Sequence, residues 1–387
     1  MKQDLALFQQ IAQKLLKAEI DEPVVEPIAA DKLFETLNLR LNEEGENEED
    51  FSKALEELVL NTPRTATHQF FNKLFGGRNG KAVLGDLLAV LLNNSMYTYK
   101  VAGPMVGVEK EIIRNMKAML NYPAEADGTV ATGGSMTNLM AMVMGRDAFN
   151  ENIPHDGVHQ KMTLYTSNES HYSIPKNASF MGIGLKQVRY IDTDQYGRMK
   201  VADLQAQIEK DKANGCHPFF INATAGTTVM GAFDPIRELS AIAKQHNMWL
   251  HVDGAYCGAV LFSDNYKYLI DGAELADSFS MNAHKMLATP LTCSIIITKN
   301  KKYLYDSFSI DAEYLYQTDG DDYNLGKTSL QCGRRNDALK FWTLWKAIGR
   351  KGLGAMVDHQ FNLAEAARAY VEKNPNYTLY SYPNSIG

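Results

Sequence analysis

The sequence has few cysteines and no long apolar run. Its four cysteines, among 387 residues, lie apart from one another without the spacing of metal ligands (Cys216, Cys257, Cys293 and Cys332). This usage argues against a zinc site or a disulfide framework and is typical of reduced packing residues in a cytoplasmic protein. Charged residues interrupt every apolar stretch well before the roughly 20 residues that a membrane-spanning helix needs.

Positive charge is not in excess either. The formal net charge is -7 and the pI is about 5.8, so the chain has no general attraction for nucleic acid or for an anionic membrane. An acidic substrate would have to be bound by local cations. The length and the 45% hydrophobic content suit a large α/β domain with smaller attachments. An amphipathic pattern from Leu5 to Leu16 predicts a surface helix at the N-terminus rather than a signal peptide.

Helical patterns dominate residues 1–90, and the acidic run 43–50 within them is interpreted as a solvated loop. From about residue 91, β-rich runs alternate with helical ones. This alternation predicts an α/β fold with parallel strands, right-handed crossovers and ligands at the carboxyl edge of the sheet. The predicted strands include 162–165, 187–191, 219–223, 249–252 and 294–298, and helices are predicted at 339–348 and 355–371.

Three parts are therefore expected along the chain. They are a helical N-terminal segment (1–90), a large domain (91–346) and the beginning of a C-terminal small domain (347–387). The run 382–387 is interpreted as the start of a further element, so we expect this last domain to be partial or truncated.

Two polar residues each follow an apolar run of the predicted sheet, Asp253 and Lys285. Alone, a lysine is usually a solvated surface cation and an aspartate a cap or turn residue. Together they are the two groups that pyridoxal phosphate needs, an amine to hold its aldehyde as a Schiff base and a carboxylate to keep its ring nitrogen protonated. The pair therefore indicates a pyridoxal-phosphate site with no metal ion.

Other runs supply further parts of such a site. The glycine turn at 131–138 opens a helix and offers backbone N–H groups to a phosphate, although such turns are common. His171 could stack on a flat ring, and Thr224 could contact it. Taken singly, His171 is as readily a core histidine and Thr224 a turn residue.

In this order the runs resemble the group II pyridoxal-phosphate-dependent amino acid decarboxylases, from about His68 to Trp345. The resemblance is strongest to the glutamate, cysteine sulfinate and aspartate branch. It is carried by 222–228 (Asn-Ala-Thr-Ala-Gly-Thr-Thr), 231–235 (Gly-Ala-Phe-Asp-Pro) and 331–334 (Gln-Cys-Gly-Arg). It implies a fold-type-I PLP-dependent transferase fold, with a mostly parallel central sheet flanked by helices, and a homodimer with active sites at the subunit interface.

The resemblance also implies roles for individual residues. Lys285 is similar to the Schiff-base lysine, Asp253 to the ring-nitrogen partner and His171 to the stacking ring, while Ala255 packs on the opposite ring face and Thr224 contacts the cofactor. The residues that would hold the phosphate end are Gly134, Ser135, Asn282 and His284. A loop tyrosine protonates the substrate Cα in this family, and we place that role on Tyr323. The segment here is shorter than the family pattern, and an ordinary loop tyrosine is the alternative.

The choice of substrate depends on a few pocket positions. Phe75, Ser95 and Tyr97 resemble the cysteine sulfinate type, and Lys73 stands where relatives usually have glutamine, so it would add a cation or point to solvent. A bulky Phe75 shortens the pocket, which favours aspartate or cysteine sulfinate and the products β-alanine or hypotaurine. One methylene discriminates by only ~1–3 kcal/mol. The alternatives are that these side chains are core packing and that the enzyme is a glutamate decarboxylase producing GABA. Another pyridoxal-phosphate lyase, a transaminase or an inactive fragment also stays open.

Overall fold

The computed structural model describes residues 1–72, 74, 76–309 and 321–380. The chain forms two compact units, residues 1–77 and 78–387. The first unit contains α1 (Lys2–Asp21), η1 (Ala30–Lys32), α2 (Leu33–Thr36) and α3 (Glu48–Leu60), with α1 packed against α3. The helix predicted at the N-terminus is thus present as α1.

The acidic run 43–50 is only partly a loop. Helix α3 begins at Glu48, and Asn47 caps it by accepting hydrogen bonds from the backbone N–H groups of Glu49 and Asp50. Carboxylates are stabilising in the first turn of a helix, because the free N–H groups there carry partial positive charge. The loop interpretation was therefore wrong for residues 48–50.

The described residues of the second unit form a seven-stranded sheet in the order β1-β7-β6-β5-β4-β2-β3. Each strand predicted from the sequence is present. The strands are β1 (Asp127–Ala131), β2 (Met162–Ser167), β3 (Val188–Ile191), β4 (His217–Thr224), β5 (Trp249–Gly254), β6 (Ser278–Asn282) and β7 (Ser294–Thr298).

The sheet departs from the prediction at one end. Strand β7 pairs antiparallel with both β1 and β6, whereas β3, β2, β4, β5 and β6 pair in parallel. Only residues 283–293 separate β6 from β7, which is too short for the helical crossover that a parallel partner needs. The expected start of the β-rich region near residue 91 was also early, because the helices Tyr99–Ala102 and Pro104–Met119 lie between residue 91 and β1.

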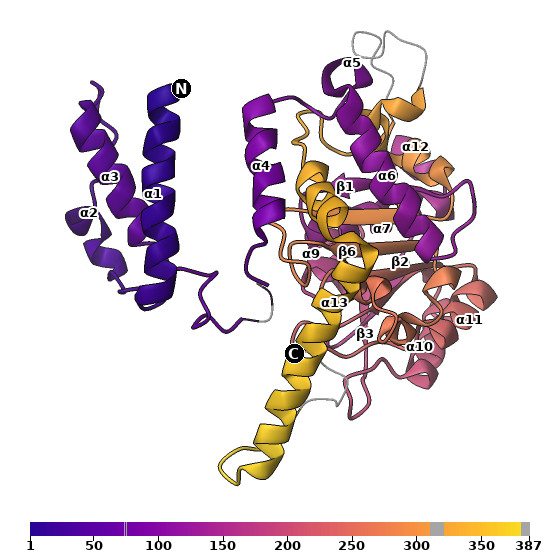
Figure 1. Ribbon diagram of the computed structural model, residues 1–387. Helices are drawn as coiled ribbons and strands as arrows, with labels where there is room; N and C mark the ends of the chain where they lie inside the picture. The colour runs from indigo at the N-terminus through magenta and orange to yellow at the C-terminus, as the bar shows by residue number, and fades with distance from the viewer. Residues whose placement is uncertain (73, 75, 310–320, 381–387) are drawn as a thin grey trace. The chain divides into compact units, whose positions relative to one another are not determined.

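Helices cover both faces of the sheet (Figure 1). One core packs the sheet against α6 (Pro104–Met119), α10 (Val201–Ala213), α11 (Ile236–His246) and α13 (Ala338–Lys373). The other packs it against α7 (Gly134–Phe149), α9 (Ser173–Phe180) and α12 (Lys301–Phe308). Strands β2, β5, β6 and β7 are buried along their whole length, as expected for a sheet enclosed on both sides. The helices are α4 (Gly80–Leu92), α5 (Tyr99–Ala102), α6 (Pro104–Met119), α7 (Gly134–Phe149), α8 (Ile153–Asp156), α9 (Ser173–Phe180), α10 (Val201–Ala213), α11 (Ile236–His246), α12 (Lys301–Phe308) and α13 (Ala338–Lys373).

Short 3-10 turns connect these elements: η2 (Leu185–Gln187), η3 (Gly258–Phe262), η4 (Lys267–Ile270), η5 (Ala273–Leu275), η6 (Asp321–Tyr323) and η7 (Leu325–Thr328). The two helices predicted at 339–348 and 355–371 both lie in α13, which is broken at Gly349 with φ 69° and ψ 175°. The domain limits at 90/91 and 346/347 stay predictions. None of the described helices is long and apolar enough to cross a membrane.

Candidate active site

A cavity of about 220 Å³ opens at the carboxyl edge of the sheet, between the ends of β4, β5 and β6 and the start of α7. This is the edge at which ligands bind in parallel α/β sheets. All nine residues predicted to bind the cofactor line it: Gly134, Ser135, His171, Thr224, Asp253, Ala255, Asn282, His284 and Lys285. The fold therefore brings together residues that are up to 151 positions apart (285 minus 134).

Lys285 lies three residues beyond β6, and its side chain is partly buried in the cavity wall. Burial lowers the pKa of its amine, while the nearby Asp253 carboxylate acts in the opposite direction. A lowered pKa increases the share of neutral amine, which is the form that attacks an aldehyde.

Asp253 is the fifth residue of β5 and is 3% exposed. Its Oδ2 accepts a hydrogen bond from Asn138 Nδ2 at 2.7 Å, and its Oδ1 accepts one from the Ala255 N–H at 3.0 Å. These two donors orient the carboxylate at the wall of the cavity. It is thus placed to hold a protonated ring nitrogen.

The turn before α7 also lines the cavity. Gly133 has φ +98°, and a Cβ added to Gly134 would lie 3.0 Å from Ala255 Cβ and 3.1 Å from Asn282 Nδ2. A side chain therefore has no room where a phosphate would approach the first N–H groups of α7, which have no partner within the helix. Asn282 Oδ1 is buried without a hydrogen-bond partner among the described residues, as expected for a group beside a ligand site.

Two histidines line the cavity. Burial lowers the pKa of His171, while the Asp253 carboxylate opposes this shift and Lys285 adds to it more weakly. The Nδ1 of His171 lies 2.9 Å from Ser173 Oγ. Burial lowers the pKa of His284 to about 4, and its Nδ1 accepts a hydrogen bond from the Cys293 N–H at 2.9 Å. Both rings are therefore neutral near pH 7. The lysine, the carboxylate, the neutral imidazole and the helix N-terminus together fit pyridoxal phosphate.

Two of the predicted substrate residues, Ser95 and Tyr97, belong to the part of the chain that the structure describes, and neither lines this cavity. Ser95 Oγ accepts hydrogen bonds from the N–H groups of Tyr97 and Arg334 and donates to the Cys332 carbonyl. Ser95 thus joins two chain segments instead of facing Lys285. Phe75 and Lys73 lie outside the described residues.

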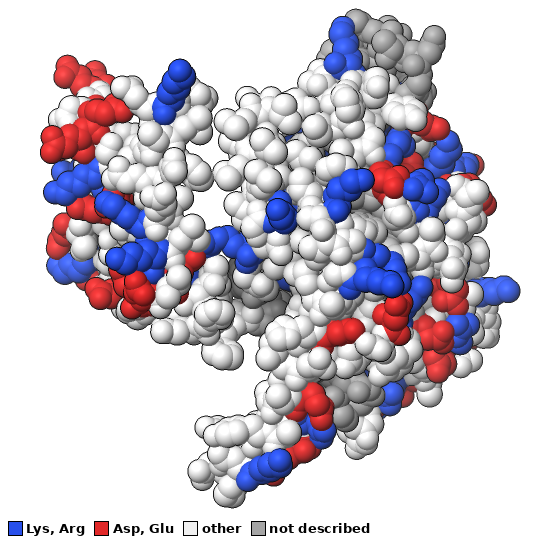
Figure 2. All heavy atoms as spheres, in the orientation of Figure 1, with Lys and Arg blue, Asp and Glu red and all other residues white. Residues whose placement is uncertain are grey.

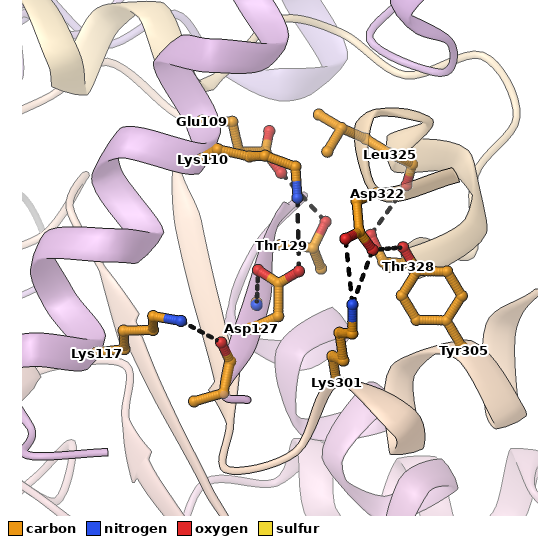
Figure 3. Close-up of polar contacts among 12 residues, drawn as sticks. Glu109, Lys110, Lys117, Asp127, Thr129, Lys301, Tyr305, Asp322, Leu325 and Thr328 are labelled. Carbon is orange, nitrogen blue, oxygen red and sulfur yellow. Dashed lines mark hydrogen bonds and ion pairs between the residues drawn. The ribbon is translucent and has the colours of Figure 1, made fainter. Parts of the chain in front are cut away.

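Tyr323 lines a separate groove of about 510 Å³ beside α6. Its ring packs edge-on against Tyr99 at 5.7 Å between centroids, and the Lys110 ammonium lies 5.7 Å above it. Figure 3 shows the polar contacts of this region, where Lys301 pairs with Asp322 and Lys110 with Asp127. The structure does not bring Tyr323 to the Lys285 cavity of the same chain, and its proton-donor role stays a prediction.

Sequence reasoning missed three residues around Asp253. Asn138 and Ser173 stand in runs that were considered, but neither was chosen, and His251 lies two residues before Asp253 on the same face of β5. That spacing of two was the available signal for His251. The contact between Asn138 and Asp253 joins residues 115 positions apart, and no local sequence pattern predicts it.

A sheet edge carrying a lysine, an aspartate and a phosphate-binding turn around one cavity defines a pyridoxal-phosphate enzyme of fold type I. The family model described as "Pyridoxal-dependent decarboxylase conserved domain" matches residues 31–386, so the chain belongs to that family and uses pyridoxal phosphate in amino acid decarboxylation.

Individual relatives agree with this assignment. The human cysteine sulfinic acid decarboxylase is 35% identical over 95% of this chain and 76% of its own length. An L-aspartate decarboxylase of Metarhizium robertsii is 32% identical over 93% of this chain and 73% of its length. The crystal structure of mouse CSAD superposes with a TM-score of 0.94 at 33% identity, covering 98% of this chain and 81% of that one.

Proposed function

We propose that the protein removes the α-carboxylate of a small acidic L-amino acid, aspartate or cysteine sulfinate. The single observation that supports the chemistry is the placing of Lys285, Asp253 and the N-terminus of α7 around one cavity. When bound, pyridoxal phosphate accepts the electron pair left behind as carbon dioxide departs. The similarity to a cysteine sulfinic acid decarboxylase and an L-aspartate decarboxylase supports the choice of substrate.

In this proposal each residue of the cavity has one task. Lys285 Nζ holds the cofactor aldehyde, the Asp253 carboxylate holds the proton of the ring nitrogen, and His171 lies against the ring with Ala255 on its other face. The first N–H groups of α7 at Gly134 and Ser135 bind the phosphate, with Asn282 and His284 beside them. Thr224, whose Oγ1 lies 3.2 Å from Ser170 Oγ, supplies a further hydroxyl at the ring edge.

The substrate's distal acid group is assigned to Ser95 and Tyr97, together with Phe75 and Lys73. Since Ser95 and Tyr97 do not line the Lys285 cavity of their own chain, this assignment requires an active site that two copies build together. Glutamate is the alternative substrate. Glutamate has one more methylene than aspartate, so it would bind only if the Phe75 side chain does not shorten the pocket.

We further propose that the protein is a homodimer. The outer face of α4 carries six large apolar side chains that are 39–58% exposed: Leu84, Leu87, Leu88, Val90, Leu91 and Leu92. In Figure 2 the surface over α4 is mostly white, with few charged atoms. Contiguous apolar surface of this kind marks an interface, and a second copy is the partner that would also bring Ser95 and Tyr97 to a neighbouring site.

We also propose a cytoplasmic location. The four free cysteines support it, because the cytoplasm is a reducing compartment.

The chemistry is tested on the purified full-length chain loaded with pyridoxal phosphate. We expect carbon dioxide release from aspartate and cysteine sulfinate to exceed release from glutamate, and borohydride to fix the cofactor on Lys285, as read by peptide mass. Lys285→Ala and Asp253→Asn should each abolish measurable turnover, whereas Lys176→Ala, at an exposed lysine outside the cavity, should not. Cofactor fixed on another lysine, or a preference for glutamate, would contradict the respective part of the proposal.

The dimer is tested by light scattering during gel filtration. Leu88→Glu on α4 should shift the protein towards monomer and lower turnover, while Leu185→Glu, an exposed leucine elsewhere, should leave both unchanged. A dimer that persists in Leu88→Glu and in a Leu87→Glu, Leu91→Glu double variant would show that this face is not the interface.

A further inference from the structure

Asn138 lies in the first turns of α7 and is 1% exposed. Its Nδ2 donates to Asp253 Oδ2 at 2.7 Å and to Ser173 Oγ at 3.0 Å. Because the oxygens of a carboxylate can only accept hydrogen bonds, the amide nitrogen must face Asp253 and the amide oxygen must face away. The orientation of this amide is therefore determined by its surroundings.

The amide oxygen of Asn138 lies 3.1 Å from His251 Nε2. An amide oxygen only accepts, so Nε2 carries the proton of this ring, and Ser280 Oγ at 3.4 Å is a second acceptor for it. Burial lowers the pKa of His251 to about 4, so the ring is neutral and its Nδ1 accepts from the Ser278 hydroxyl at 2.8 Å. Ser278 Oγ in turn accepts from Trp249 Nε1 at 2.9 Å. The hydrogen bonds from Trp249 through Ser278 and His251 thus fix the position of the Asn138 amide oxygen.

The second N–H of the Asn138 amide donates to Ser173, which in turn contacts His171. The Ser173 backbone N–H donates to His171 Nδ1 at 3.2 Å, and Ser173 Oγ lies 2.9 Å from the same nitrogen. Since Nδ1 accepts from a backbone N–H, it carries no proton, and the neutral ring keeps its proton on Nε2. Ser173 Oγ accordingly accepts from Asn138 and donates to His171. All hydrogen bonds from Trp249 to His171 then run in one direction.

We propose that Asn138 is a positioning residue for the decarboxylation, because its single amide group orients the Asp253 carboxylate and, through the Ser173 hydroxyl, directs a hydrogen bond to His171 Nδ1. This inference rests on the proposed function, in which Asp253 meets the ring nitrogen and His171 lies against the ring. The amide couples the two groups, because turning Asp253 breaks its hydrogen bond to Asn138 and turning His171 breaks its hydrogen bonds to Ser173. Hydrogen-bond partners that orient metal ligands typically change activity by about 10- to 100-fold when they are substituted, and Asn138 stands in the same relation to Asp253.

The first measurement is the nitrogen-15 chemical shift of His171 Nδ1, read by NMR of histidine-labelled full-length protein with and without pyridoxal phosphate. Four variants are compared with the wild type. Asn138→Ala removes the amide, Asn138→Asp keeps its size but replaces the donor by an oxygen, and Ser173→Ala interrupts only the branch to His171. Asn336→Ala is the matched control, another 1% exposed asparagine, whose Oδ1 accepts from the Leu339 N–H instead. The Ser173 backbone N–H still donates to Nδ1 in every variant, so we expect the Nε2–H form to persist. The Nδ1 chemical shift should move in the first three variants, where the hydrogen bond from the Ser173 hydroxyl is lost or redirected, and should stay unchanged in the control.

The second measurement is steady-state kinetics of the loaded enzyme. In Asn138→Ala and Asn138→Asp, kcat should fall about 10- to 100-fold, while KM changes by less than about 3-fold, because orientation and not substrate binding is lost. In Ser173→Ala the fall should be smaller, since Asp253 keeps its hydrogen bond to Asn138. Should Asn138→Ala not fold, the isosteric Asn138→Asp and the conservative Ser173→Ala carry the same comparison.

The outcomes separate this inference from the proposed function. A wild-type kcat together with an unchanged His171 Nδ1 chemical shift in Asn138→Asp would overturn the role of Asn138 alone. Borohydride labelling of a lysine other than Lys285 in the wild type would instead overturn the proposed function. The NMR spectrum of His171 in the protein without cofactor does not depend on whether Lys285 is the lysine that carries the cofactor.

Discussion

The Arg334 guanidinium and the Glu109 carboxylate form an ion pair in the interior, with the side chains 4% and 2% exposed. Glu109 Oε1 also accepts from the Val130 N–H at 2.9 Å, and Arg334 Nη2 donates to the Val130 carbonyl at 2.7 Å. The Arg334 backbone N–H donates to Ser95 Oγ, and the Arg334 carbonyl accepts from the Met96 N–H. The pair thereby joins strand β1, which leads to the turn proposed to bind the phosphate, to the segment proposed to select the substrate.

Breaking the ion pair between Arg334 and Glu109 should lower the stability of the folded protein. In Glu109→Gln the Arg334 charge stays buried without its counter-ion, and its Nε and Nη1 already have no partner among the described residues. We expect the free energy of unfolding to fall by about 3–5 kcal/mol, measured by denaturant titration. The double variant Glu109→Gln, Arg334→Met should recover part of this loss. Asp271→Asn, in an exposed ion pair with Arg237, is the control and should change stability little. Equal effects in the buried and exposed pairs would contradict the prediction.

Stability should depend on pH through two buried histidines. Burial lowers the pKa of His251 and of His284 to about 4, from 6.5. Between these values the unfolded chain binds more protons than the folded one, so the free energy of unfolding is at its full value above about pH 6.5 and falls as the pH drops towards about 4. Denaturant midpoints at several pH values measure this slope. His251→Gln should flatten it, and His155→Gln, at an exposed histidine, should not. A slope that is the same in both variants would show that His251 does not contribute.

Tyr323 has two possible roles that one substitution separates. If its hydroxyl donates a proton to the substrate, Tyr323→Phe should keep the cofactor bound and lower turnover, with more transamination product, and this is the outcome we predict. The phenylalanine ring preserves the contact with Tyr99 and the Lys110 ammonium, so packing is retained. Cofactor absorbance and carbon dioxide release are the measurements. Unchanged turnover would leave ring packing as the role of Tyr323.

Gly326 provides a test of Tyr97 in substrate selection. A Cβ at position 326 would lie 2.3 Å from Tyr97 Cε2, so Gly326→Ala must displace the ring. We expect the ratio of kcat/KM for aspartate to that for glutamate to fall about 10-fold, in the range that a small pocket change produces. Tyr97→Phe removes only the hydroxyl and should shift the ratio in the same direction. Gly107→Ala, where an added Cβ meets nothing within 4 Å, is the control. Equal ratios in all variants would remove Tyr97 from the proposed pocket.

The sequence alone predicted the strands, the family and a shared cavity for the proposed cofactor residues. Lys285, Asp253 and the turn at Gly133 each follow an apolar strand, and parallel strands bring their carboxyl ends to one edge, so local patterns sufficed to predict one shared cavity. The family resemblance added roles that no pattern contains.

Only the tertiary structure decided what lies around those residues. The direction of β7 followed from the short connection behind β6, and the pairs Asn138–Asp253 and Glu109–Arg334 join positions 115 and 225 apart in the chain. Buried polar groups must find partners wherever packing places them, and sequence spacing carries no record of such contacts. The substrate roles of Ser95 and Tyr97 stay predictions, and only the fold shows that Ser95 is hydrogen-bonded to the backbone around Arg334.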